Sequence, residues 1–190
     1  MKSFALNGTL RKELGKKATK AVRANGNIPC ILYGNGKTIA TFEVTSNDVR
    51  KLVYTPEIFV VELTIDGKSY KAVMQELQFH PVSDRIIHID FLEVTEEKPV
   101  VMQVPVRLEG LAAGVKAGGK LSLDARKLKV QGLIKDIPEK LVVNVDALEL
   151  GKAIQVKNLE FAGLKFISPA NALVCSVKAT RGSRAATSEE

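Results

Sequence analysis

Hydrophobic and polar residues alternate with a period of two over much of the first half of the chain, a pattern typical of β-strands with one buried face. The alternating and apolar runs predict six strands, at residues 4–10, 28–33, 38–44, 58–65, 69–77 and 85–94. Two of the links contain an Asn-Gly or Asp-Gly pair, at residues 35–36 and 66–67. These pairs readily adopt the positive φ angles of tight turns, so we expect two hairpins.

Residues 15–26 depart from the alternation and show helical spacing. The apolar residues of this segment, with the leucine just before it, recur on one stripe of a helix: Leu14, Ala18, Ala21 and Val22. Its cations fall on the opposite side: Lys16, Lys20 and Arg23. We expect the apolar stripe to rest on a core and the basic ridge to face outward. A merely solvated cationic face is the alternative interpretation.

A second short helix is expected after residue 44. The polar run at residues 45–48 resembles a capping box, in which side chains satisfy backbone N–H groups at the start of a helix. Pro56 ends this helix, because proline cannot donate the backbone hydrogen bond that a helix interior needs.

Polar residues 95–99 separate this part from a second β-rich part, and we place a domain boundary there. Further short strands are expected at residues 100–108, 121–123, 127–131, 140–145, 153–156 and 173–177. The predicted fold class is mainly β with a few short helices. The predicted domains are residues 1–95 and 99–180, and residues 181–190 are small and polar and are expected to form a disordered tail.

The strand predicted at residues 85–94 has two different faces. Ile87, Ile89 and Phe91 share one face, and His88 and Asp90 share the other. We expect the apolar face to be buried. The polar pair is then exposed on the sheet, where both side chains can form hydrogen bonds with base edges or ribose hydroxyls.

The net charge of the chain is concentrated at its N-terminal end. Residues 1–37 hold eight of the 28 basic residues and one of the 21 acidic residues, so they carry the whole net charge of +7. Clustered lysines and arginines displace counterions from phosphates, which indicates a polyanionic partner. Aromatic residues make up only 5% of the chain, so few rings are available for base stacking.

The cysteine content and the lack of long apolar runs argue against a disulfide-rich secreted protein and against a membrane-spanning one. Cys30 and Cys175 lie far apart in the sequence, which indicates reduced, buried thiols in a cytosolic protein; a disulfide between them is the alternative. The first ten residues lack the apolar run of a signal peptide, and no run approaches the length of a membrane span.

Known catalytic and metal-binding motifs are absent or incomplete. Gly114, Gly119 and Lys120 match the core of a phosphate-binding loop, but Leu121 stands where a hydroxyl should hold magnesium. The residues that follow alternate like a strand, and that motif requires a helix, so we expect a glycine-rich turn. His80 and His88 are the only histidines, too few for a zinc site with cysteines so distant. No nucleophile elbow accompanies the His–Asp pair.

Two stretches of the chain resemble the signatures of a known family. The first comprises residues 11–18, Arg23, residues 28–29 and residues 32–34. The second comprises residues 75–81 and the tetrapeptide His-Ile-Asp-Phe at residues 88–91. Together they resemble the bacterial large-subunit ribosomal proteins that bind 5S rRNA. The chain is similar to the long form of that family, also known as a general stress protein, with residues 99–180 as its additional β domain.

The resemblance implies a fold and a set of partners. The N-terminal domain should be a six-stranded β-barrel similar to the anticodon-recognition barrel of glutaminyl-tRNA synthetase. It should bind an irregular internal loop of 5S rRNA in the central protuberance of the cytoplasmic ribosome, among large-subunit neighbours, as a monomer. No cofactor, metal, membrane or small-molecule substrate is expected, and no enzymatic activity.

The resemblance also implies the residues that contact RNA. Carried over position by position, they are Arg11, Gly15, Lys16, Thr19, Lys20, Arg23, Tyr33, Gln75, Gln78, His88 and Asp90. Thr19 stands where the family usually has serine, and Lys20 and Ala21 stand where it has two arginines. Lysine lacks the bidentate fork of arginine, so we expect the same binding mode with weaker electrostatics.

Physical chemistry divides these residues into two groups. Cations on the helix suit phosphates, which fix the position of the protein but carry no sequence information. Tyr33, Gln78, His88 and Asp90 suit ribose or base edges. Because a carboxylate repels phosphate, Asp90 should accept from a base amino group or orient His88.

Three other functions remain open from the sequence. One is a stress-linked protein that binds tRNA or other non-ribosomal RNA. Another is a cationic module for membrane surfaces or heparin, although Ala18, Ala21 and Val22 are small for membrane insertion. The third is an enzyme with an unrecognised site. The contacts of residues 99–180 are also open.

Overall fold

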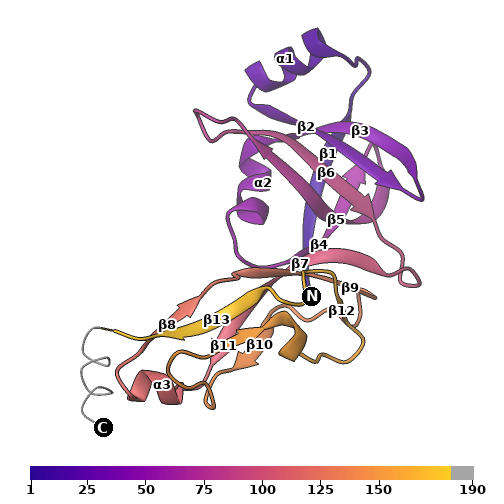
Figure 1. Ribbon diagram of the computed structural model, residues 1–190. Coiled ribbons are helices and arrows are strands. Elements are labelled where there is room, and N and C mark those ends of the chain that lie inside the picture. Colours follow the sequence, from indigo (N-terminus) through magenta and orange to yellow (C-terminus); the bar gives the residue numbers. More distant parts are fainter. Residues whose placement is uncertain (181–190) are drawn as a thin grey trace. The chain divides into compact units, whose positions relative to one another are not determined.

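The computed structural model describes residues 1–180, so the predicted disordered tail lies outside the described residues. The chain divides into two compact units, residues 1–98 and the part that begins at Pro99 (Figure 1). Both units are built mainly of strands with a few short helices, which confirms the predicted fold class. Within the described part of the chain, no helix is long and apolar enough to cross a membrane.

The first unit contains a closed six-stranded barrel, as the family resemblance implied. Its strands are β1 (Lys2–Leu10), β2 (Asn27–Gly34), β3 (Lys37–Thr45), β4 (Phe59–Ile65), β5 (Lys68–Phe79) and β6 (Ile86–Glu93). Around the barrel the order is β1-β3-β2-β6-β5-β4. β1 closes the barrel, because it pairs antiparallel with β3 and parallel with β4. A closed sheet leaves no edge open to unwanted strand pairing.

The two predicted hairpin turns are confirmed. Asn35 and Gly36 join β2 to β3 with φ angles of 52° and 74°, and Asp66 and Gly67 join β4 to β5 with φ angles of 45° and 80°. Asparagine, aspartate and glycine tolerate this left-handed region better than other residues. The turn residues therefore fix the pairing of the strands on either side.

Alternating apolar side chains fill the barrel. On β3 these are Ala40, Phe42 and Val44, all buried. The ring centres of Phe42 and Phe91 lie 5.8 Å apart, and both side chains are fully buried. Phe42 fits because β1 has a glycine beside it. A Cβ on Gly8 would lie 2.5 Å from the Cδ2 atom of Phe42, closer than atoms can pack.

The first unit contains two helices, α1 (Lys16–Ala24) and α2 (Ser46–Val53). α2 buries Val49 and Leu52 in the barrel core, so the predicted second helix is confirmed. The predicted capping box is wrong, because Thr45 at the N-cap makes no side-chain capping bond. The backbone N–H of Ser46 binds the carbonyl of Gly26 instead, at 3.3 Å. A backbone contact thus ties the start of α2 to the start of β2.

The second unit holds two small sheets. Its strands are β7 (Val100–Glu109), β8 (Lys120–Leu123), β9 (Lys127–Gly132), β10 (Leu141–Asn144), β11 (Ala153–Gln155), β12 (Lys165–Phe166) and β13 (Leu173–Lys178). One sheet has the order β10-β7-β9-β12, and the other has the order β11-β13-β8. Two short helices, α3 (Ala113–Lys116) and the 3-10 helix η1 (Val156–Asn158), complete this unit. β12, α3 and η1 are too short for the sequence pattern to predict.

The phosphate-loop lookalike is not a nucleotide site. Lys120 begins strand β8, which covers the strand predicted at residues 121–123, so no helix N-terminus follows it. The expected simple turn is wrong in detail, because Gly114 lies in α3. A Cβ at Gly114 would lie 2.5 Å from the backbone nitrogen of Leu150, so this glycine serves close packing of two backbone segments.

Both cysteines are free and buried, as expected. Burial raises the pKa of the Cys30 thiol, and the nearby Asp90 carboxylate raises it further. Burial also raises the pKa of Cys175. A thiol that resists ionisation is a poor nucleophile, so both behave as small apolar core residues.

We predict that residues 1–98 fold without the second unit, because their strands close on themselves around a core of their own. A polypeptide of these residues alone should show a β-type circular dichroism spectrum and a single cooperative thermal transition. A polypeptide of residues 99–180 is the matched control for the other unit. Aggregation of the 1–98 polypeptide, or melting without cooperativity, would contradict this division.

Candidate RNA-binding site

Predicted site residues from three barrel strands gather on one outer surface. Tyr33 projects from β2, Gln75 and Gln78 from β5, and His88 and Asp90 from β6; these five residues are called the polar face below. β6 lies between the other two strands, and Gln78 pairs with His88 in the β5–β6 register. The closed barrel therefore brings together side chains that are more than fifty residues apart in the sequence.

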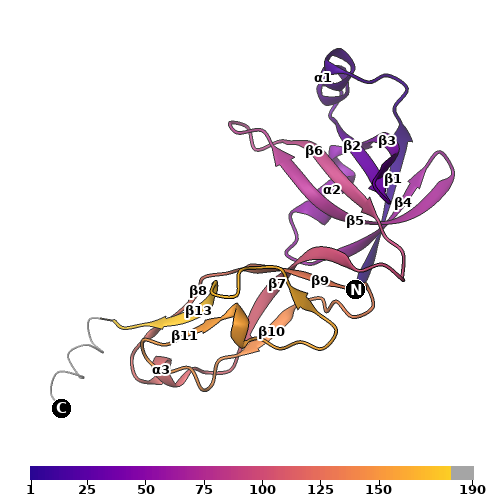
Figure 2. The same ribbon diagram turned by 45° about the vertical axis from the view of Figure 1, so that its right-hand side comes forward.

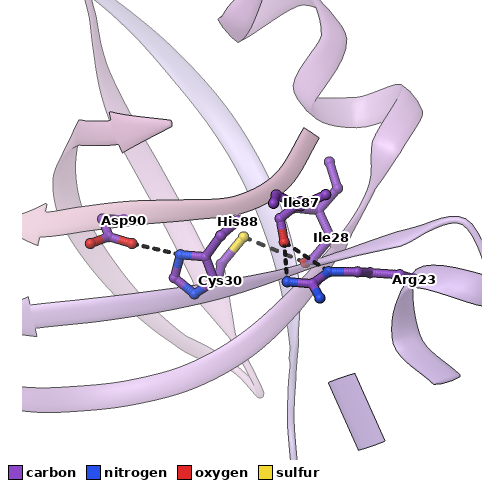
Figure 3. A network of polar contacts seen from close by, with 6 residues as sticks. All are labelled: Arg23, Ile28, Cys30, Ile87, His88 and Asp90. Carbon is purple, nitrogen blue, oxygen red and sulfur yellow. Dashed lines mark hydrogen bonds and ion pairs between the residues drawn. The ribbon is translucent and has the colours of Figure 1, made fainter. Parts of the chain in front are cut away.

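His88 and Asp90 form a direct contact on this surface. Nδ1 of His88 lies 2.7 Å from Oδ1 of Asp90, and both side chains are half-buried (Figure 3). An ionised carboxylate can only accept, so Nδ1 must carry a proton. In the neutral imidazole Nε2 is then an acceptor. Asp90 therefore fixes the orientation of the His88 ring, and its Nε2 atom can form a hydrogen bond with any partner that docks here.

Two irregularities in the β5–β6 pairing shape the same surface. The register skips Gln75, and bulges of this kind redirect a side chain. It also skips Ile87, and Ile86 packs against the barrel core in its place. The expectation that Ile87 shares the buried face with Ile89 is therefore wrong, because the bulge reverses the alternation at this end of β6.

A further acidic residue, not expected from the sequence, lies close to the polar face. Glu76 pairs with Asp90 in the β5–β6 register. The pKa of Tyr33 is raised, first by burial and then by the charges of Asp90 and Glu76. Tyr33 therefore keeps its phenolic proton and is a hydrogen-bond donor. Strict alternation does not predict the position of Glu76, because the bulge at Gln75 shifts the pattern by one residue. Both residues lie in the same sequence motif.

α1 carries the basic ridge, but it does not rest on the core. None of its residues is buried, and Leu14 just before it is 65% exposed. The expectation that its apolar stripe packs on a core is therefore wrong, because Ala18 and Val22 are only half-buried, Ala21 is exposed, and none of them belongs to the barrel core. Figure 2 shows α1 standing clear of the barrel strands. Something other than apolar burial must fix its position.

Arg23 provides one such contact. Its Nε and Nη2 atoms donate to the backbone carbonyl of Ile87, at 3.0 Å and 2.8 Å (Figure 3). Ile87 is the residue that the β5–β6 register skips, one position before His88. The bulge thus offers a carbonyl to the last turn of α1. This contact, which we call the Arg23 clamp, joins the basic helix to the strand that bears His88 and Asp90.

Arg11 anchors the other end of α1. Its Nη2 atom donates to Oγ1 of Thr19 at 3.0 Å and to the carbonyl of Glu13 at 3.4 Å. Its backbone N–H binds the carbonyl of Thr41 on β3. The Nε atom of Arg11 is buried and has no partner within residues 1–180. Arg11 and Thr19 thus hold the helix in place, a role that the sequence did not reveal.

The remaining predicted residues of this segment are open to solvent. Lys16 and Lys20 are exposed and make no ion pair with the described residues. Gly15, at the N-cap of α1, has φ 100°, which favours glycine. The structure therefore brings α1 and the polar face together through β6, with the lysine charges free for a ligand.

Candidate metal ligands do not cluster in residues 1–180. No group of three or more His, Cys, Asp or Glu residues could hold a metal ion there. In the second unit, Ser176 and Ser122 donate to the carboxylate of Asp124 at 2.8 Å and 3.1 Å. These bonds, with Lys178 nearby, lower the pKa of Asp124. The cluster links β8 to β13 and resembles a structural cross-link.

Comparison with known proteins agrees with both units. Residues 6–91 match the Ribosomal L25p family, and residues 99–181 match a family described as ribosomal protein TL5, C-terminal domain. A relative from Porphyromonas gingivalis is 59% identical, over 98% of this chain and 97% of its own. One from Bacteroides thetaiotaomicron is 52% identical over 98% and 97%, and one from Azobacteroides pseudotrichonymphae is 51% identical over the full length of both chains. All three are named large ribosomal subunit protein bL25.

The fold and the matches define a two-unit β protein of the ribosomal class. The chain belongs to the ribosomal L25p family, in the form that carries a TL5-type C-terminal domain. The family predicted from residues 11–34 and 75–91 is thereby confirmed. A family of ribosomal proteins also confirms the expectation that the chain is not an enzyme.

We predict that the Arg23 clamp, rather than burial, holds α1 in place. A nine-residue helix is marginal in isolation, so Arg23→Ala should loosen it. Amide hydrogen exchange of residues 16–24 should become about tenfold faster, equivalent to ~1.4 kcal/mol. Exchange in β4 and β5 should not change.

Lys20→Ala is the matched control, since it removes an exposed cation from the same helix without touching Ile87. Unchanged protection of α1 in Arg23→Ala would show that other contacts hold the helix.

Proposed function

We propose that this chain is a structural protein of the large ribosomal subunit in the bacterial cytoplasm and binds an irregular internal loop of 5S rRNA in the central protuberance. Membership of the L25p family and the shared name of the relatives support the first part. The choice of 5S rRNA and of an internal loop rests on the sequence resemblance and on the arrangement of α1 and the polar face.

One structural observation carries the proposal. A basic helix without buried residues is fixed beside a polar strand face by Arg23 on Ile87. A solvated cationic face would need no such anchor. The arrangement combines cations for phosphates with hydrogen-bonding groups for bases on one continuous part of the barrel.

The chemistry of the two parts differs. Lys16 and Lys20 are exposed point charges, which suit phosphate oxygens and set the position of the RNA. His88 offers a ring nitrogen oriented by Asp90, and Tyr33 offers a hydroxyl donor. Regular A-form RNA hides its base edges in a deep groove, so these side chains can contact base edges only where the helix is distorted, as in an internal loop. An internal loop is therefore the RNA element that fits this site.

We propose different main roles for two of the residues expected to contact RNA. Both Arg11 and Arg23 were expected to contact RNA, and both have hydrogen-bond partners within the barrel unit. The guanidinium of Arg23 still has N–H groups to spare for a phosphate. We propose that these arginines act mainly by presenting Lys16 and Lys20 at a fixed position.

In this proposal the two units contact different partners. Every proposed RNA contact lies in residues 1–95, and the matching family covers residues 6–91. Residues 99–180 hold twelve basic and seven acidic residues, which are scattered along the sequence rather than clustered. We propose that they contact neighbours in the large subunit and that the protein enters it as a monomer.

We predict that phosphate contacts and base contacts separate in binding experiments. Lys16→Ala should weaken binding to 5S rRNA and to an unrelated RNA by similar factors, because phosphates carry no sequence information. His88→Ala should weaken binding to 5S rRNA by about 1–3 kcal/mol and have little effect on the unrelated RNA. Filter binding of each full-length variant to both RNAs measures these effects.

Circular dichroism checks that both variants are folded, and Lys71→Ala on β5 controls for the loss of one exposed charge. Equal losses on the two RNAs for His88→Ala would rule out base reading by this residue. A tRNA transcript serves as the unrelated RNA. A preference for the tRNA over 5S rRNA would favour the alternative function in non-ribosomal RNA binding.

A further inference from the structure

A polar groove separate from the polar face lies on the barrel unit, beside α2. It has a volume of about 680 Å³ and is bounded by the end of α1, the start of β2, α2 and the loop between β5 and β6. Its lining residues include Arg23, Ser46, Asn47, Arg50, Tyr54, His80, Asp84 and Arg85. Of the residues assigned to the RNA site above, only Arg23 lines it.

The groove is strongly cationic. Three arginines line it, Arg23, Arg50 and Arg85, against a single acid, Asp84. Arg50 and Arg85 are exposed, and within residues 1–180 their guanidinium groups have no ion-pair or hydrogen-bond partner. Guanidinium groups form planar forks that match phosphate oxygens. The two free forks of Arg50 and Arg85, with the positive charge of Arg23 beside them, therefore indicate an anionic ligand.

Two further side chains narrow the class of ligand. Nδ1 of His80 accepts from the backbone N–H groups of Val82 and Ser83, both at 3.3 Å. The neutral ring must then carry its proton on Nε2, which makes it a donor. The side chain of Tyr54 is 62% exposed, although aromatic residues are scarce in this chain and most aromatic rings pack in cores. An exposed ring beside arginines is a stacking surface for a nucleobase.

We propose that this groove binds a single-stranded RNA segment, with phosphates on Arg50 and Arg85 and a base stacked on Tyr54. The barrel then holds two RNA segments, one on α1 and the polar face and one in the groove, and joins them. The inference rests on the proposed function in taking RNA as the polyanion. An acidic peptide would satisfy the arginines but would leave the ring of Tyr54 without a stacking partner.

The test uses the full-length chain and a fluorescently labelled uridine decamer, with binding followed by anisotropy. Binding is measured alone and after saturation with an unlabelled 5S rRNA fragment that contains the internal loop. The groove should bind the decamer in both conditions. Arg50→Ala with Arg85→Ala should weaken decamer binding about tenfold and change binding of the 5S rRNA fragment far less. Tyr54→Ala should also weaken decamer binding, whereas Tyr54→Phe should retain it because it keeps the ring.

The matched control is Lys68→Ala with Lys71→Ala, which removes the same charge from exposed positions at the opposite end of β5. Equal losses in the two double variants would overturn the proposal, since the decamer would then respond only to net charge. Tighter binding of a glutamate decapeptide than of the decamer would also overturn it. Failure of the proposed 5S rRNA site can be told apart from failure of the groove. In that case the fragment binds weakly, while the substitutions of Arg50 and Arg85 still weaken binding of the decamer.

Discussion

The position of the C-terminal end of α1 depends on two hydrogen bonds from Arg23 to the carbonyl of Ile87, while Arg11 holds the other end of the helix. Most helices in small domains are fixed by an apolar stripe, as α2 is by Val49 and Leu52. α1 has no buried residue, so polar contacts must replace apolar burial. The acceptor is available at the point where the β5–β6 register skips Ile87. A local irregularity in the sheet thus determines where the basic charge of the protein lies.

The closed barrel explains why one strand can serve both parts of the proposed interface. Alternation along β6 places Ile89 and Phe91 in the core and His88 and Asp90 outside. The bulge at Ile87 then connects the same strand to α1. Movement of the helix relative to the polar face would require breaking the Arg23 clamp or distorting a strand that is paired on both sides. The position of α1 relative to the polar face is therefore fixed before RNA binds, which lowers the entropic cost of binding.

Much of this architecture could be predicted from local sequence patterns. Period-two alternation located the six barrel strands, and Asn35-Gly36 and Asp66-Gly67 located two turns, because each depends on neighbouring residues alone. Closure of the barrel required the family resemblance, since β1 pairs with β4, a strand far away in the sequence. The predicted packing of α1 on a core was wrong, because helical spacing reveals an apolar stripe but not whether a core lies beneath it.

Part of the geometry of the candidate site could also be predicted from the sequence. The contact between His88 and Asp90 follows from their spacing on one strand face. The roles of Arg11 and Arg23 within the fold did not follow, because their partners Thr19 and Ile87 become neighbours only through the turn before α1 and the bulge in β6. Glu76 was missed for the same reason, since a bulge shifts the alternation that would have placed it.

The central claim is that α1 and the polar face form one interface for RNA. The most direct measurement is the change in amide chemical shifts of the ¹⁵N-labelled full-length chain when a 5S rRNA fragment containing the internal loop is added. The account predicts simultaneous shifts in α1 and around Gln78, His88 and Asp90, with residues 99–180 unaffected. Shifts confined to residues 99–180, or to α1 without β6, would contradict it.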